Sequence, residues 1–168
     1  MSNIIRLNET APRSEWIVMS NQGTDSFLDL LITAAGTFEK TEHQEELLSF
    51  LKEQKELNDI APGTAGFDLT EMPWRVGTLA DDADFLLRVT AEAQNESVFT
   101  KLPYDADRDI VIPWINQFAG LVESMKNKAK ALRGDENGYS GSAGEKQCTF
   151  QNTTKKSSTS TITADCLK

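Results

Sequence analysis

The clearest pattern in the sequence is a stripe of apolar residues in its second half. Between residues 111 and 132, large side chains recur every three or four positions, a period typical of an amphipathic helix. Proline fits the first turn of a helix but clashes deeper inside. The pattern therefore predicts a helix over 113–132 that begins at Pro113, with 110–112 extended. The stripe consists of Val111, Trp114, Ile115, Phe118, Leu121, Val122, Met125, Ala129 and Leu132.

Two shorter helices are predicted in the first third of the chain. Apolar residues at helical spacing predict a helix over about 26–37, with a stop signal at Gly36. Thr41 and Gln44 have the Thr-x-x-Gln form of a capping box, and an apolar stripe follows them. This predicts a second helix over about 42–57. The connection between the two helices is short, so we expect them to pack as an antiparallel pair.

The period changes in the middle of the chain. From Asp84 to Gln94 apolar and polar residues alternate, with Leu86 as the exception, which is typical of a half-buried strand. Residues 74–79 form a second candidate strand, and the polar turn 80–83 would join the two into a hairpin. The hairpin of about 74–94 is thus the main predicted sheet.

Two further segments complete the predicted body. Residues 14–20 favour another strand, and residues 58–73 are dense in Gly and Pro and predict a loop. Together the elements predict an α+β fold, in which a small antiparallel sheet is packed by three helices on one face.

The composition changes after Arg133. Residues 134–168 are rich in Gly, Ser, Thr, Asn and Lys and have few large apolar side chains, too few to offset the entropy of ordering the segment. We expect a single domain over 1–133 and a flexible tail over 134–168. The alternative is a weak hairpin within the tail, which would let Cys148 and Cys166 pair in an oxidising compartment.

The charge is concentrated in the body. The chain carries a net charge of −9, and residues 1–109 hold nine Lys and Arg against 21 Asp and Glu, a net −12. Residues 110–133 are basic, with a net +3. An acidic body repels nucleic acid and anionic membranes, so neither is expected as a direct partner. With no apolar run long enough to span a bilayer and no signal-like N-terminus, a cytoplasmic protein is expected.

Two groups of aspartates are candidate binding residues. Asp81, Asp82 and Asp84 fall at the predicted hairpin turn, and Asp105 and Asp107 precede the long helix. The second group has the spacing of the first ligands of a calcium loop, but the Gly and Glu that such a loop needs are absent. We expect solvated acidic turns at both places, with no metal, cofactor or catalytic residue.

His43 is a candidate for chemistry, and Trp74 is a candidate for binding. His43 is expected on the surface, in the first turn of the second helix, and both cysteines that could serve as its nucleophile lie in the predicted tail. Trp74 is interpreted as core or core-edge packing, with an aromatic anchor for a partner as the alternative.

The function expected from these observations is binding of a basic protein. An acidic surface steers a cationic partner and gives a fast, salt-sensitive association, as immunity proteins, antitoxins and other inhibitors of basic proteins use. The predicted partner-binding residues are the five aspartates and Trp74. Two alternatives remain: a small enzyme whose site forms no recognisable motif, and an accessory subunit that docks through the long helix.

Overall fold

The computed structural model describes residues 2–137 and shows an α+β fold, as predicted. The helices are α1 (Asn21–Ala35), α2 (Glu42–Ile60), α3 (Leu79–Glu92), α4 (Glu96–Phe99) and α5 (Arg108–Asn137). The strands are β1 (Ser2–Arg6), β2 (Ile17–Ser20) and β3 (Phe67–Asp68), and two short 3₁₀ turns are η1 (Arg13–Glu15) and η2 (Leu69–Glu71).

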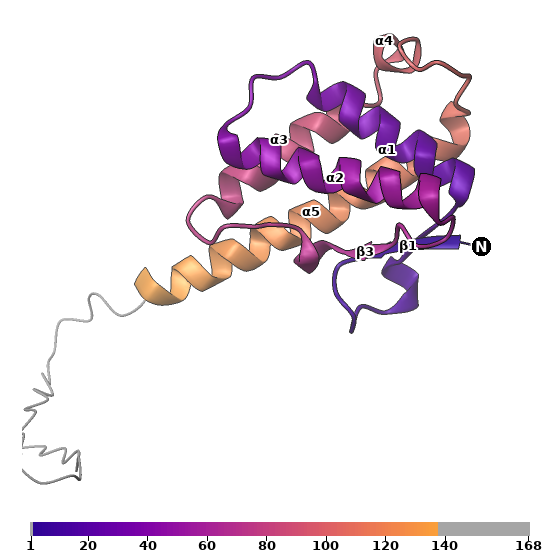
Figure 1. The fold of residues 1–168 in the computed structure, drawn as a ribbon. Coiled ribbons are helices and arrows are strands. Elements are labelled where there is room, and N and C mark those ends of the chain that lie inside the picture. The colour runs from indigo at the N-terminus through magenta and orange to yellow at the C-terminus, as the bar shows by residue number, and fades with distance from the viewer. Residues whose placement is uncertain (1, 138–168) are drawn as a thin grey trace, which may run out of the picture.

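The sheet lies along one side of the helices (Figure 1). Its order is β2-β1-β3, with β1 antiparallel to β2 and parallel to β3, so the prediction of a purely antiparallel sheet was wrong. Ile5 of β1 stands opposite Ile17 and Phe67, and all three are buried under the helices. The strand expected at 14–20 is confirmed for Ile17–Ser20, which form β2. The helices cover one face of the sheet, while Val18 on the other face is 51% exposed.

The predicted hairpin of 74–94 was wrong, because α3 occupies most of it. Asp82, Leu86 and Val89 are buried at helical spacing. Leu86, the residue that broke the alternating pattern, faces the core as the helical period requires. The alternation also failed because Leu87, placed on the apolar face of the strand, is only half-buried in the helix.

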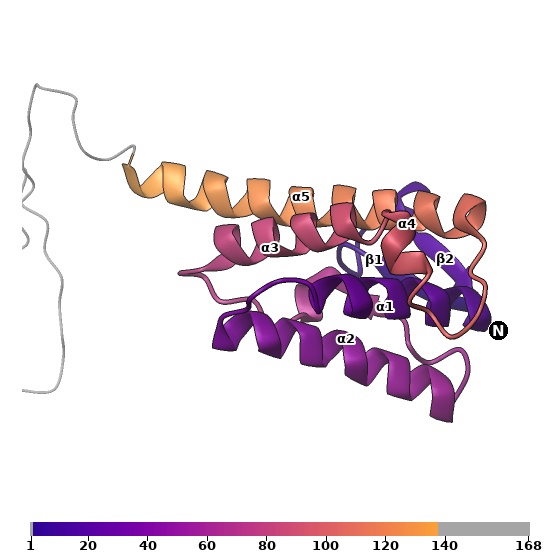
Figure 2. The ribbon, with the colours of Figure 1, turned by 90° about the horizontal axis from the view of Figure 1, so that it is seen from above.

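The first two helices form the antiparallel pair that was predicted, side by side in Figure 2. Helix α1 begins earlier than expected, because the Ser20 hydroxyl accepts a hydrogen bond from the Gly23 backbone N–H at 3.1 Å and caps the helix. Helix α2 begins as predicted: the capping box of Thr41 and Gln44 is present in both directions. It continues to Ile60 through the first residues of the expected loop.

Helix α5 starts before Pro113, which corrects the prediction of an extended 110–112. The backbone carbonyl of Asp107 accepts hydrogen bonds from the N–H groups of Ile110 and Val111, so the helix is already formed there. Val111 is 2% exposed. Its burial favours the helical start although the proline leaves the Asp109 carbonyl without its helical donor.

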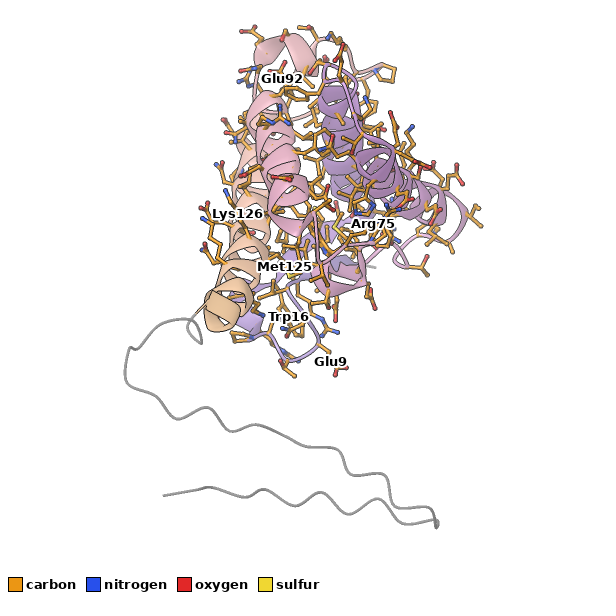
Figure 3. The ribbon with its side chains drawn as sticks, turned by 90° about the vertical axis from the view of Figure 1, so that its left-hand side faces the viewer. Glu9, Trp16, Arg75, Glu92, Met125 and Lys126 are labelled. Atoms are coloured by element: carbon orange, nitrogen blue, oxygen red, sulfur yellow. The ribbon has the colours of Figure 1, made fainter. Side chains whose placement is uncertain are left out.

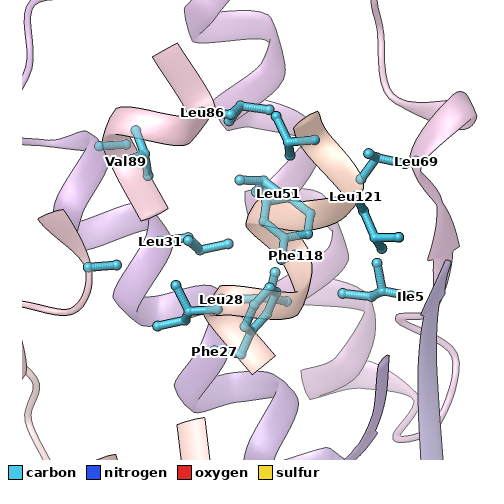
Figure 4. Packing of buried hydrophobic residues seen from close by; sticks show 14 of the residues in the cluster. Ile5, Phe27, Leu28, Leu31, Leu51, Leu69, Leu86, Val89, Phe118 and Leu121 are labelled. Atoms are coloured by element: carbon cyan, nitrogen blue, oxygen red, sulfur yellow. The ribbon is translucent and has the colours of Figure 1, made fainter. Parts of the chain in front are cut away.

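The core lies between the helices and the inner face of the sheet (Figure 4). Phe27 of α1 and Phe118 of α5 meet edge to face, with ring centroids 5.5 Å apart. A buried polar network fastens β1 to this core: the Asn3 side-chain amide donates to Thr24 at 2.8 Å and to Asn58 at 2.7 Å. The side-chain oxygen Oδ1 of Asn3 accepts a hydrogen bond from the Ala65 backbone N–H at 3.1 Å.

The predicted tail lies outside the described residues from 138 onward, and Cys148 and Cys166 lie there too. Residues 134–137, which were assigned to the tail, continue α5. Within residues 2–137, no helix has both the length and the apolar character that crossing a bilayer requires.

Candidate protein-binding groove

One face of α2 is lined with carboxylates. Glu42, Glu45, Glu46 and Glu53 follow one another at helical spacing, so they share a side of the helix. They border a groove of about 470 Å³, together with Ser49 and Phe50 of the same helix. Like charges three or four positions apart destabilise a helix by roughly 0.2–0.5 kcal/mol per pair. This repulsion is partly offset, because Glu46 pairs with Arg75 and the acids of the first turn favour the positive end of the helix.

The opposite wall of the groove comes from the segment that follows β3. Glu71 of η2 and Pro73 line it. Glu71 is held in place because its carboxylate accepts the backbone N–H of Asp68 at 3.0 Å. The groove thus brings five glutamates from two segments around one apolar surface.

Phe50 supplies an aromatic surface among these carboxylates. Its ring is half-buried and stands edge to face on Phe67 of β3, with centroids 5.2 Å apart. This contact holds the Phe50 ring against β3, and part of the ring stays exposed in the groove. Aromatic residues, Phe among them, are enriched in protein interfaces, and charges across an interface contribute to specificity.

Glu46 connects the groove with the interior. Its carboxylate contacts His43 Nδ1 at 2.7 Å and accepts a hydrogen bond from Arg75 at 2.7 Å. The hydrogen bond with His43, with a further contribution from the charge of Arg75, lowers the pKa of Glu46 below its ordinary value. Glu46 is therefore a fixed negative charge of the groove. Arg75 lies at the end of the molecule that faces the viewer in Figure 3.

His43 is buried, which corrects its predicted place on the surface. It is 5% exposed, and its Nε2 lies 3.2 Å from the Asp82 carboxylate, close enough for an ion pair but not aligned as a hydrogen bond. Asp82 is itself 2% exposed and accepts a hydrogen bond from the Thr78 hydroxyl at 2.7 Å. The ring nitrogens of His43 both face carboxylates, so the imidazole joins α2 to α3.

The structure separates the three aspartates that were expected at a hairpin turn. Asp81 is exposed in the first turn of α3, Asp82 points into the protein, and Asp84 pairs with Lys126 of α5. Lys126 is labelled on α5 in Figure 3. The three do not form one surface, because successive positions on a helix point in different directions.

Asp105 and Asp107 lie in the turn that leads into α5, as expected. They line a second hollow of about 200 Å³ beside Trp114 and the start of α1. A side-chain oxygen of Asp107 accepts a hydrogen bond from the Asp109 N–H at 3.0 Å. This carboxylate therefore stabilises the first turn of α5. Neither residue lines the groove of α2.

Trp74 packs at the edge of the core, the interpretation preferred from sequence. It is half-buried against the core, and its indole N–H donates to the Leu69 carbonyl at 2.7 Å. Its role as an anchor for a partner stays a prediction. Residues 2–137 contain no group of three His, Cys, Asp or Glu side chains placed to hold a metal ion.

The groove was not among the predicted sites. The spacing of its acids along α2 is visible in the sequence, but the candidate binding residues were chosen among aspartates elsewhere in the chain and Trp74. Glu71 and Pro73 could not be added, because only the tertiary fold brings them to α2. Comparison with models of protein families, with curated proteins and with solved structures found no match to this chain.

Proposed function

We propose that this chain is a protein-binding module that takes a basic segment of a partner protein into the groove of α2 and η2. The observation that carries the proposal is the half-buried Phe50 among five glutamates from two separate segments. A partner segment with one apolar side chain for Phe50 and flanking Lys or Arg would match both features. Such charge complementarity speeds association and selects the partner more than it raises affinity.

The charge of the rest of the body favours the same class of partner. Residues 1–109 carry a net charge of −12, so the long-range field attracts cations toward the groove and repels phosphate backbones. If the basic segment is the functional surface of the partner, its occupation would inhibit the partner, as an immunity protein or antitoxin does. This narrower role is part of the proposal.

Capture from a lysate of the source cells tests the proposal with variants of the groove. Immobilised wild-type protein is compared with Glu45→Lys/Glu53→Lys at low and at high salt. The control is Glu56→Lys/Glu123→Lys, which changes the net charge equally at exposed positions outside the groove.

We expect wild type and the control to retain one basic protein at low salt, and the groove variant to lose it. High salt should release it, because the charges lie at the surface. Equal capture by both double variants would contradict the proposal, and so would a partner that is itself acidic.

A further inference from the structure

Three of the four lysines that follow α5 are collected in one short segment, residues 146–156. Segment 146–156 holds Lys146, Lys155 and Lys156 and contains neither Asp nor Glu. Phe150, its one aromatic residue, stands between these lysines. The segment therefore has the composition that complements the groove of α2 and η2, an apolar side chain flanked by cations.

The chain leaves α5 at the end of the molecule where α2 begins. Figure 1 and Figure 2 both show the last turn of α5 and the first turn of α2 at this end. Phe150 comes 13 positions after Asn137, the last residue of α5, and a chain of that length spans up to about 45 Å. Helix α2 has 19 residues and is therefore about 28 Å long. The connecting chain is longer than α2 itself, so the groove lies within its reach.

The order of residues in the segment matches the order of groove residues along α2. From the end where α2 begins, the groove presents Glu42 first and Phe50 later, and the segment presents Lys146 first and Phe150 later. Four positions of extended chain span about 13 Å, and eight positions of helix span about 12 Å. With the two phenylalanines in contact, Lys146 therefore lies beside Glu42.

We propose that segment 146–156 occupies the groove of its own chain and competes there with the basic segment of a partner. This inference rests on the proposed function, because both use the groove of α2 and η2. A short tether gives an effective concentration of roughly millimolar order. A segment with a dissociation constant of about 1 mM then fills about half of the grooves, and a partner segment binds about twofold more weakly.

Paramagnetic relaxation in the full chain tests the occupation without any partner. The nitroxide label is attached to Cys148, which lies in the segment, and Cys166→Ser leaves this as the one thiol. Amide signals of the isotope-labelled chain are compared before and after chemical reduction of the nitroxide. We expect the oxidised label to broaden the signals of residues 42–53 and 69–73 at low salt, and high salt to remove the effect.

Two pairs of variants show whether the groove and the segment cause this broadening. On the groove side, Glu45→Lys/Glu53→Lys should lose it and Glu56→Lys/Glu123→Lys should retain it. On the segment side, Lys146→Glu/Lys155→Glu should lose it. Its control is Lys128→Glu/Lys130→Glu, which makes the same change of net charge at exposed positions of α5 and should retain it. The segment pair leaves residues 2–137 unchanged and decides the matter even if the groove pair does not fold.

The same segment variant should bind the peptide Lys-Arg-Leu-Arg-Lys about twofold more tightly than wild type. Signals in the groove that the label does not broaden, or equal broadening in both members of a pair, would overturn the proposal. So would broadening that appears only when the nitroxide and the isotopes are on different molecules, because the occupant would then be a second copy. Each of these results leaves the capture of a partner to decide the proposed function. Broadening without a captured partner would refute the proposed function alone.

Discussion

Glu46 links the groove on the surface to the buried His43. One side of its carboxylate borders the groove, and its oxygens contact the buried His43 and the exposed Arg75. Its charge is thereby fixed in position before any partner arrives, which reduces the ordering cost of binding. Glu53, further along α2, borders the same groove and is exposed to solvent. The two residues thus offer a direct comparison of a fixed carboxylate with a solvated one.

The lowered pKa of Glu46 makes a prediction about acid stability. A carboxyl group whose pKa is lower in the folded than in the unfolded state stabilises the fold above its unfolded value of about 4.3. This contribution is lost as the pH falls through the folded value. Chemical unfolding at several pH values should therefore show that wild type loses stability on acidification more steeply than Glu46→Gln.

Glu53→Gln is the matched control on the same helix and should follow wild type. Wild type and Glu46→Gln share every other carboxyl group, so the difference between these two proteins isolates Glu46. Parallel curves for wild type and Glu46→Gln would show that the contact with His43 does not lower the pKa of this carboxyl group.

At the scale of elements, the sequence predicts features that depend on local signals and misses features that depend on tertiary contacts. Helix α2 was predictable because its capping box and its apolar stripe are both local. Helix α3 was missed because the coincidental alternation after Asp84 outweighed the contrary evidence of Leu86. Strand β1 pairs with β3 more than 60 positions away, Ile5 with Phe67, and such pairing leaves no periodic signal in a short window. The same holds for the groove. The spacing of the glutamates on α2 indicates that they share one side of the helix, whereas nothing in the local sequence indicates that η2 lies opposite them.

Two glycines give opposite predictions because their surroundings differ. A Cβ at Gly66, just before β3, would lie 2.6 Å from the Ile4 carbonyl oxygen and 2.9 Å from the Ile4 nitrogen. These are backbone atoms that cannot rotate away, so Gly66→Ala must push β1 from β3, at a cost of roughly 1–3 kcal/mol. Gly120 in α5 has open space around it, and Gly120→Ala should stabilise the helix by about 1 kcal/mol.

Urea unfolding of both variants measures the two effects in one experiment. The opposite signs are the decisive result, because a general sensitivity of the chain to alanine would move both variants in one direction. If Gly66→Ala unfolds at the same urea concentration as wild type, the close approach of β1 to this segment is wrong.

At the scale of the whole molecule, opposite charges collect on different elements. The glutamates of the groove lie on α2 and η2, whereas Lys126, Lys128 and Lys130 lie on α5. Lys126 pairs with Asp84 of α3, so part of the basic charge of α5 already acts within the fold. The groove is distinguished from the rest of the acidic surface because five glutamates lie there around the half-buried Phe50.

The central claim is that this groove takes a basic segment, and NMR titration tests it most directly. The probe is the peptide Lys-Arg-Leu-Arg-Lys, added to isotope-labelled wild type, to Glu45→Lys/Glu53→Lys and to Glu56→Lys/Glu123→Lys. We predict amide shift changes concentrated on residues 42–53 and 69–73 in wild type and in the control pair, and their loss in the groove pair. Changes scattered over the acidic surface, or changes of the same size in both double variants, would contradict the claim.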